Sequence, residues 1–311
     1  MRIIVVGAGG VGGLVGGLLA RSGVEVAFVA RGRQLEALRA RGLHIAGPRG
    51  TFHLERVEVA QDPAQLTPAD VVFVAVKCWQ VAELAPKLSP AIKPGGFVVP
   101  LENGVEAAAT LVQALGDERV ASGFCAMLSW IEAPGLIRYD GKTLRVVLGE
   151  RNGNKSARLQ ELAQRLNAAD IDASISDDIE AASWEKFLFI APFGAVGAVT
   201  RAAVGIVRSL PETRALLTAA TQEVATLARS RGVRIHPDAV NRALAMIDAL
   251  QSEATASMQR DIQEGRPSEL HDQIGAVVRM ARAGGVSVPT CEFLFTSLLP
   301  QEFAARKAAN A

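Results

Sequence analysis

The chain has 311 residues, which is more than one average domain holds and predicts two domains. Hydrophobic residues make up 49% and charged residues 21%, a composition that excludes a disordered chain and supplies packed cores. Lys plus Arg number 33 against 32 Asp plus Glu, so the overall charge supports neither a nucleic-acid partner nor an anionic membrane surface.

The first third of the chain alternates short β-branched runs with amphipathic stretches, as in a parallel sheet flanked by helices. The predicted elements are a strand over 2–6, a helix over 11–22, a strand over 25–30 and a helix over 34–41. The runs at 70–76 and 97–100 predict further strands of the same sheet, with a helix over 80–88 between them.

The pattern then changes twice. Residues 123–149 are β-rich, and the pairs Pro134-Gly135 and Asp140-Gly141 indicate turns, so we expect an antiparallel extension of the same sheet. A helix over 155–166 and a strand over 171–174 follow. Beyond these the strand signals end, which predicts an α/β domain over 1–176 and an all-helical domain over 177–311.

Three features bear on the compartment. Cys78, Cys125 and Cys291 lie far apart without paired zinc or redox spacing, which favours a reducing cytoplasm. The apolar N-terminal run up to Ala20 is broken by glycines and lacks a cleavage site, so we expect no export signal. The apolar stretch 187–200 is too short to span a bilayer and predicts a buried core helix. We therefore expect a cytoplasmic protein without a membrane segment.

A G-x-G-x-x-G pattern follows the first predicted strand and opens the first predicted helix. It consists of Gly7, Ala8, Gly9, Gly10, Val11 and Gly12. In this context Gly7 permits a tight turn, Gly9 leaves room for a pyrophosphate, and Gly12 lets helix and strand pack closely. The helix N-terminus offers N–H groups and a positive dipole end to the phosphates. The pattern predicts a Rossmann-type dinucleotide-binding domain.

The end of the second predicted strand indicates which dinucleotide binds. Arg31 follows this strand, at the position where an NAD-dependent enzyme would offer Asp or Glu to the ribose diol. Arg31, with Arg33 close behind, can instead form charge-assisted bonds to a 2′-phosphate. The sequence therefore predicts NADP (NADPH) as the cofactor.

Polar side chains follow two later strands of the predicted sheet. Lys77 comes after the strand over 70–76, and Asn103 comes after the strand over 97–100. Both are expected at the carboxyl edge of the sheet, where open α/β folds bind ligands. Position alone leaves open a solvated lysine and a plain Asn-Gly turn.

Two further candidates lie in the predicted helical domain. Lys186 stands near Trp184 at the head of an almost wholly apolar segment, and burial there would lower the pKa of its ammonium and improve it as a proton donor. A lysine that reaches past the aromatic rings to water is the alternative. Pro267 and Ser268 predict a helix start, with Glu269 in the first turn, where its charge would complement the helix dipole.

Together these residues resemble the ketopantoate reductases (2-dehydropantoate 2-reductases) over essentially the whole chain. Besides the glycine pattern, the resemblance rests on Arg31, Lys77, Asn103-Gly104, Trp184, Lys186, Ser257-Met258, Asp261 and Glu269. It implies a Rossmann-type NADP-binding domain followed by an all-helical domain. It also implies reduction of a 2-oxo acid to a 2-hydroxy acid, best matched by 2-dehydropantoate to pantoate in pantothenate biosynthesis.

The resemblance also implies residue roles. Lys186 would donate the proton to the ketone oxygen, and Asn103 would position both the lysine and the cofactor. Glu269 would contact the nicotinamide ribose and support the substrate, Ser257 would bind the substrate carboxylate, and Lys77 would bind the cofactor. We expect no metal, because the four histidines show no ligand spacing.

Three positions depart from the family pattern. Ile190, Gly194 and Ala254 stand where the resemblance places asparagines. Loss of polar contacts favours, as an alternative, a paralogous NADP-dependent reductase of a more apolar or bulkier 2-oxo acid.

The glycine pattern is also compatible with a non-catalytic NADP-binding redox sensor, which would need no proton donor, and with a dehydrogenase of opine or hydroxy-acid type. The expected partner is a small 2-oxo acid, and the apolar helices of the second half are compatible with a homodimer.

Overall fold

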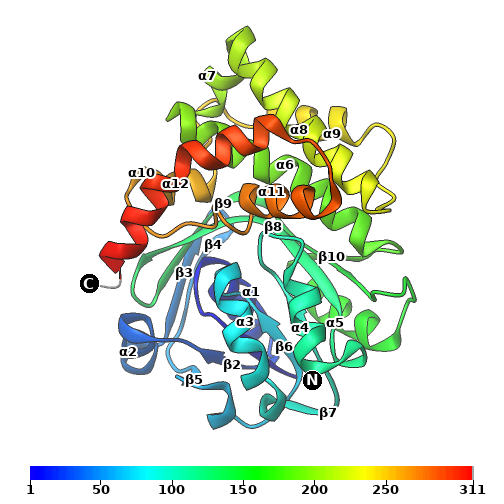
Figure 1. Ribbon diagram of the computed structural model, residues 1–311. Coiled ribbons are helices and arrows are strands. Elements are labelled where there is room, and N and C mark those ends of the chain that lie inside the picture. The colour runs from blue at the N-terminus through cyan, green and yellow to red at the C-terminus, as the bar shows by residue number, and fades with distance from the viewer. Residues whose placement is uncertain (310–311) are drawn as a thin grey trace. The chain divides into compact units, whose positions relative to one another are not determined.

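The computed structural model describes residues 1–309, apart from the side chains at positions 142 and 143. The chain forms two compact units, the first coloured blue to green and the second green to red in Figure 1. The first unit consists of residues 1–102 and 106–179, and the second of Asn103–Val105 with the described chain from Glu180 onward. Asn103–Val105 therefore belongs to the second unit, although the chain on both sides of it belongs to the first.

The first unit is built on a five-stranded parallel sheet in the order β5-β2-β1-β6-β7. Its strands are β1 (Arg2–Val6), β2 (Glu25–Val29), β5 (Glu58–Ala60), β6 (Ala69–Val74) and β7 (Ile92–Pro100). The central strand β1 is buried along its whole length, as its run of β-branched residues predicts. Because all pairs are parallel, the carboxyl ends of the strands meet at one edge.

Helices and short helical turns connect these strands. The α-helices are α1 (Gly10–Arg21), α2 (Gly32–Arg41), α3 (Val81–Leu84), α4 (Ala107–Leu115) and α5 (Ala157–Ala168). The 3₁₀ turns are η1 (Pro63–Gln65), η2 (Cys78–Gln80), η3 (Ala85–Lys87), η4 (Ser89–Ala91) and η5 (Asp117–Arg119). The continuous helix predicted over 80–88 is wrong, because Pro86 lacks an N–H and divides the segment into short turns.

A second sheet is the main departure from the sequence prediction. It contains β3 (Leu43–Gly47), β4 (Gly50–Leu54), β9 (Leu136–Gly149) and β10 (Asp172–Ile175) in the order β10-β9-β3-β4, with β8 (Ser122–Ala133) also paired to β9. The predicted extension of the first sheet is therefore wrong, because 123–149 forms a hairpin of this separate sheet. The chain reverses at Pro134-Gly135, whereas Asp140-Gly141 lies inside β9, where its pairing with β8 is irregular.

The glycines of α1 explain how one helix serves both sheets. A Cβ at Gly16 would lie 3.0 Å from a methyl group of Val5 in the first sheet. A Cβ at Gly13 would lie 2.8 Å from the side chain of Ile137 in the second sheet. Larger residues on either face would push α1 away from one of its partners, because a packed interior has no room for added atoms.

The described part of the second unit is formed by helices alone. They are α6 (Ile179–Thr200), α7 (Val204–Ser209), α8 (Pro211–Ser230), α9 (Ala239–Asp248), α10 (Ser257–Gln263), α11 (Ile274–Gly284) and α12 (Pro289–Ala309). α6 supplies many of the residues of the apolar core, including the predicted core segment 187–200. The α/β fold with a helical second part is the predicted fold class, which is confirmed.

Two expectations about where helices begin are wrong. Lys186, expected at the head of its apolar segment, lies inside α6, which begins at Ile179. α11 begins at Ile274, so Pro267 and Ser268 do not open it and Glu269 lies in the preceding turn. The hydroxyl of Ser268 accepts a bond from the N–H of Leu270 and donates to Glu302, and these bonds hold a turn in place of a helix cap.

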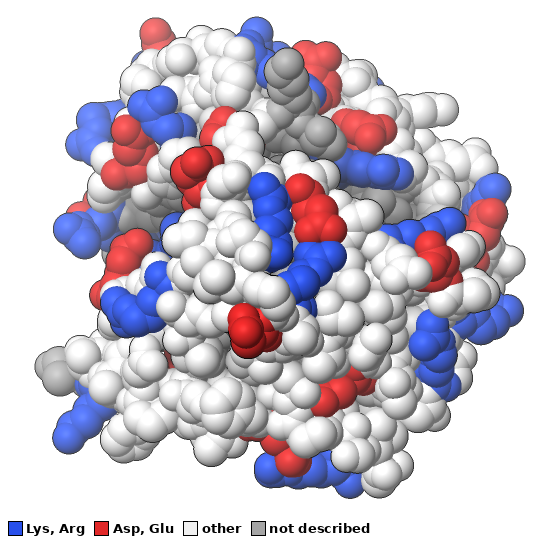
Figure 2. All heavy atoms as spheres, turned by 90° about the horizontal axis from the view of Figure 1, so that it is seen from above, with Lys and Arg blue, Asp and Glu red and all other residues white. Residues whose placement is uncertain are grey.

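The surface agrees with the balanced composition. On the face shown in Figure 2, basic and acidic side chains are interspersed and form no large area of one sign. Within residues 1–309, no helix combines the length and the apolar character that crossing a bilayer requires.

Candidate active site

The glycine loop between β1 and α1 is tight at two positions and open at a third. Gly7 has a φ of +103°, and a Cβ there would lie 2.5 Å from the carbonyl oxygen of Ala75. A Cβ at Gly12 would collide with the carbonyl oxygen of Gly7. In contrast, apart from Gly9 and its two chain neighbours, no described atom lies within 4 Å of a Cβ built at Gly9. The loop thus leaves its backbone open to an approaching group at Gly9.

The N-terminus of α1 adjoins this open position. Gly9 is the N-cap residue, and no described side chain forms a hydrogen bond to the cap. The first helical bond runs from the N–H of Gly13 to the carbonyl oxygen of Gly9 at 2.8 Å, so the N–H groups of the first turn have no acceptor inside the helix. Unpaired N–H groups and a positive dipole end are suited to the pyrophosphate of a dinucleotide.

The basic residues at the end of β2 are exposed. Arg31 is the N-cap of α2, and Arg33 is the second residue of that helix. Both side chains are accessible to solvent, and the segment from Val29 to Arg33 contains no carboxylate. This is the charge pattern that a ribose 2′-phosphate requires.

Lys77 is held at the carboxyl edge of the first sheet. It follows β6 closely, is half-buried, and precedes the turn η2. Its backbone N–H donates to the side-chain oxygen of Gln80 at 3.1 Å. Its ammonium lies 5.8 Å from the centre of the Trp79 ring, within the range of a cation–π interaction.

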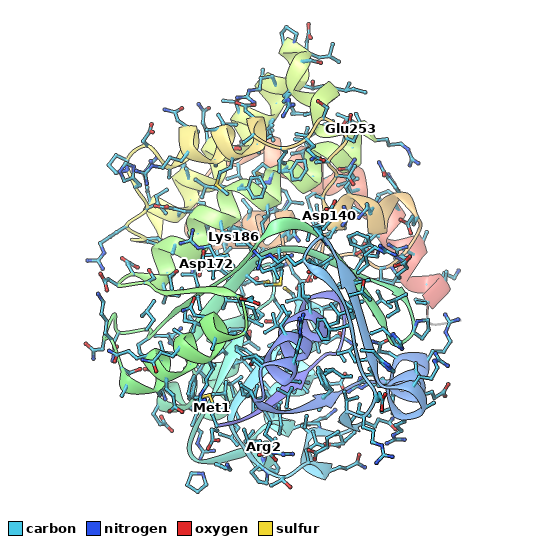
Figure 3. All side chains as sticks on the ribbon, turned by 180° about the vertical axis from the view of Figure 1, so that it is seen from behind. Met1, Arg2, Asp140, Asp172, Lys186 and Glu253 are labelled. Atoms are coloured by element: carbon cyan, nitrogen blue, oxygen red, sulfur yellow. The ribbon has the colours of Figure 1, made fainter. Side chains whose placement is uncertain are left out.

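Asn103 and Lys186 meet inside the second unit. The ammonium nitrogen Nζ of Lys186 donates a hydrogen bond of 2.8 Å to Oδ1 of Asn103. Both side chains are half-buried, and Figure 3 labels Lys186 on α6. Trp184 and Phe187, on either side of the lysine in sequence, are buried and pack edge to face. The structure therefore fixes the direction of the Lys186 side chain beside an apolar core.

Glu269 lies on a turn that is fixed from two sides. It is 5% exposed, and its carboxylate accepts a long bond of 3.5 Å from the amide of Gln273. The preceding residue, Ser268, donates through its N–H and hydroxyl to Glu302, which is 1% exposed. Arg306 donates to Glu302 at 2.6 Å and to the carbonyl oxygen of Ser268 at 3.1 Å. Hydrogen bonds from α12 therefore hold the turn that carries Glu269.

The start of α10 and the nearby part of α6 carry Ser257 and several apolar residues. Ser257 is exposed at the start of α10, and the next residue, Met258, is buried. A Cβ at Gly194 would lie 3.0 Å from the methyl group of Met258, so the space beside α6 is filled by this thioether side chain. Ile190 and Ala254 are partly buried against the core of the unit. The positions where the resemblance expects asparagines are thus apolar in this chain.

Three polar residues that the sequence interpretation missed bond to candidate residues or to their neighbours. They are Gln34, which bonds to the glycine loop, Gln273, which bonds to Glu269, and Glu302. A signal existed for Glu302, because the buried positions of α12 recur every three or four residues and Glu302 occupies one of them. The described residues contain no group of three or more His, Cys, Asp or Glu that could hold a metal ion.

Comparison with known proteins places the chain in a family. The family model described as ketopantoate reductase PanE/ApbA matches residues 3–153, and the model described as its C-terminal part matches residues 178–302. The 2-dehydropantoate 2-reductase of Halobacterium salinarum is 31% identical over 297 residues, which cover 94% of this chain and 96% of that relative. The uncharacterized oxidoreductase YkpB of Bacillus subtilis is 28% identical over 300 residues, which cover 96% and 98%.

A solved structure agrees with these matches. The crystal structure of 2-dehydropantoate 2-reductase from Geobacter metallireducens has a TM-score of 0.90 and 30% identity to this chain, and the match covers 96% of this chain and 99% of that one. The two family models together span most of the sequence. The chain therefore belongs to the ketopantoate reductase family, whose members bind a nicotinamide dinucleotide, and it is an oxidoreductase that acts on CH–OH groups.

Proposed function

We propose that the protein reduces 2-dehydropantoate to pantoate with NADPH, as a step of pantothenate biosynthesis in the cytoplasm. The observation that carries the proposal is the bond of 2.8 Å between Lys186 Nζ and Asn103 Oδ1. It holds a proton-carrying group in one direction, which a protein that only binds a dinucleotide does not need. A homodimer stays a prediction from the apolar helices.

Several residues of the candidate site would hold the cofactor. The open position at Gly9 and the N–H groups of the first turn of α1 would bind the pyrophosphate. Arg31 would bind the 2′-phosphate and Lys77 another part of the cofactor, while Asn103 and Glu269 would contact its nicotinamide end. When bound, NADPH supplies a hydride to the carbonyl carbon of the substrate.

Lys186 would complete the reduction by supplying the proton. Hydride addition to a ketone leaves negative charge on the oxygen, and a nearby ammonium both stabilises this charge and neutralises it. The proton moves from Nζ to that oxygen, so ketone, hydride and proton give the secondary alcohol. Neutral Lys186 then takes up a proton from water. Asn103 would keep Nζ oriented, because its amide oxygen accepts one of the ammonium hydrogens.

Substrate orientation would depend on two residues of the second unit. The hydroxyl of Ser257 is exposed at the start of α10 and would bind the substrate carboxylate. Glu269 carries the same charge as that carboxylate, so its contacts would be to hydroxyl groups of the substrate or of the cofactor ribose.

A second substrate class is favoured by a specific observation. Met258 fills the space beside Gly194, and Ile190 and Ala254 are apolar. With these positions apolar, the site has fewer polar groups that could discriminate in favour of a substrate hydroxyl. A paralogous NADP-dependent reductase that acts on a more apolar or bulkier 2-oxo acid is therefore the second candidate.

One assay tests both candidates. NADPH oxidation would be followed by absorbance with 2-dehydropantoate, with the branched 2-oxo acid that lacks its terminal hydroxyl, and with an aromatic 2-oxo acid. The proposal expects the highest kcat/KM with 2-dehydropantoate. A higher kcat/KM with either apolar acid would assign the second candidate, and no oxidation with any member of the panel would refute both.

A further inference from the structure

Gln34 joins two distant parts of the first unit through both ends of its amide. Its Nε2 donates a hydrogen bond of 2.8 Å to the carbonyl oxygen of Ala8 in the glycine loop. Its Oε1 accepts a bond of 2.9 Å from the N–H of Gly135 at the tip of the β8–β9 hairpin. The side chain is half-buried in the first turn of α2. One side chain thus connects the dinucleotide loop to the second sheet.

The hairpin end of this bridge is itself fixed. Gly135 has a φ of +82°, and its carbonyl oxygen accepts a bond of 2.8 Å from the N–H of His44 in β3. The carbonyl oxygen of Pro134 accepts a bond of 3.3 Å from the guanidinium of Arg41. Because the N–H of Gly135 requires an acceptor, the oxygen of Gln34 faces the hairpin and the NH₂ group faces Ala8.

The bond to Ala8 determines how the loop presents its next N–H group. The described chain contains no cis peptide bond, so the carbonyl of Ala8 and the N–H of Gly9 point in opposite directions. Fixing the carbonyl towards Gln34 therefore turns the N–H of Gly9 away from it. Gly9 is also the open position of the loop, where no described atom beyond its chain neighbours would contact an added Cβ.

We propose that Gln34 is a positioning residue for the cofactor pyrophosphate, which holds the glycine loop in its phosphate-binding conformation before the dinucleotide arrives. The inference rests on the proposed function only in taking a dinucleotide as the ligand. Arg31 begins the same helix and would meet the 2′-phosphate directly. Gln34 should therefore affect NADPH and NADH equally, whereas Arg31 should affect NADPH alone.

The test is the affinity of the purified full-length protein for each dinucleotide without substrate. In Gln34→Ala the Kd values for NADPH and NADH should both rise by about five- to tenfold, because the loop loses one or two neutral hydrogen bonds. The kcat at saturating NADPH should stay within about twofold, because the proton donor is untouched. The matched control Gln160→Ala, on an exposed position of α5, should change neither Kd.

A second variant separates positioning from general structural damage. Gln34→Glu keeps an acceptor for Gly135 but sets a carboxylate against the carbonyl oxygen of Ala8, so binding of NADP⁺ should be weak at neutral pH. Protonation restores a donor, so its Kd relative to that of the unmodified protein should fall as the pH approaches about 4.5. A merely structural defect would give no such recovery at acid pH. Such a defect would instead lower the unfolding temperature of the apo variant.

Three results would overturn the inference. They are unchanged Kd values in a folded Gln34→Ala, a rise for NADPH without a rise for NADH, and no acid recovery in Gln34→Glu. Because none of these three results requires a 2-oxo acid, a failure of the substrate panel would leave the result for Gln34 unaffected.

Discussion

Asn103 and Lys186 are 83 residues apart in the chain, yet their side chains share a hydrogen bond of 2.8 Å. Asn103 follows β7 of the first unit but belongs to the second unit together with the lysine. The ammonium is therefore held by a loop residue that reaches it from a different element, not by a neighbour on its own helix. This relationship makes the first two predictions specific.

Replacing Lys186 by Ala should lower kcat by about two to four orders of magnitude, because the variant lacks the donor that neutralises the developing alkoxide. The Kd for NADPH should stay nearly unchanged. Lys307→Ala, which removes an exposed lysine of α12, is the matched control and should leave kcat intact. A normal kcat in Lys186→Ala would remove the lysine from the mechanism.

Replacing Asn103 by Asp should change the pH dependence of turnover. A carboxylate beside the ammonium favours its protonated form, so the pKa of Lys186 should rise and the basic limb of the kcat profile should move to higher pH. A lysine that holds its proton more tightly is also a poorer acid, so maximal kcat should fall. Steady-state rates over a range of pH check both effects, and a basic limb at its original pH would contradict the pairing.

Replacing Arg31 by Ala should raise the Kd for NADPH by roughly ten- to a hundredfold, as the loss of charge-assisted bonds to a phosphate predicts. The Kd for NADH should change little, since NADH lacks the 2′-phosphate. Arg39→Ala is the matched control, because Arg39 is exposed on the same helix. Equal weakening of both cofactors would show that Arg31 does not recognise the 2′-phosphate.

The sequence predicts well what local patterns determine. The β1–α1–β2 segment follows from β-branched runs and from glycines whose roles at Gly7 and Gly9 agree with their backbone geometry. The second sheet was not predicted as such, because strand periodicity does not say which sheet a strand joins. Which sheet a strand joins depends on how it packs against α1. Gly16 leaves room for the first sheet, and Gly13 leaves room for the second.

Contacts between distant residues account for most of what was missed at the candidate site. Gln34 looks like an ordinary helix residue until Gly135, 101 positions away, is placed beside it. Likewise, Ser268 has the sequence signature of a helix cap, but its hydroxyl is taken by Glu302, 34 positions away. These long-range bonds override local propensity. The free-energy cost of a buried acceptor without a partner exceeds the stabilisation that a helix cap contributes.

Replacing Glu302 by Ala should lower the free energy of unfolding by about 2–3 kcal/mol. The change leaves the N–H and hydroxyl of buried Ser268 without their acceptor, whereas Arg306, about one-third exposed, can turn to water. Urea unfolding measures the effect, and Gln301→Ala at the adjacent exposed position is the control. A decrease no larger than that of the control would show that the bonds between Glu302 and Ser268 contribute little to stability.

Acid should weaken the second sheet through a pair of histidines. His44 and His53 face each other across β3 and β4, and their rings stack with centres 3.6 Å apart. Burial lowers the pKa of His44, and the positive charges of His53 and Arg41 lower it further. A folded-state pKa below the unfolded value of about 6.5 means that the unfolded chain binds the proton more readily.

The free energy of unfolding should therefore fall as the pH drops below about 6.5, and this loss should stop growing once the pH is below the folded pKa of His44. In His53→Gln the neighbouring charge is gone, so the pKa of His44 should rise. The decrease in the free energy of unfolding at acid pH should then be smaller. Titration of the His44 ring by NMR measures the first effect, and urea unfolding at several pH values measures the second. If the midpoint for His44 is the same with and without His53, burial and Arg41 lower its pKa and the charge of the stacked partner has no part in the acid response.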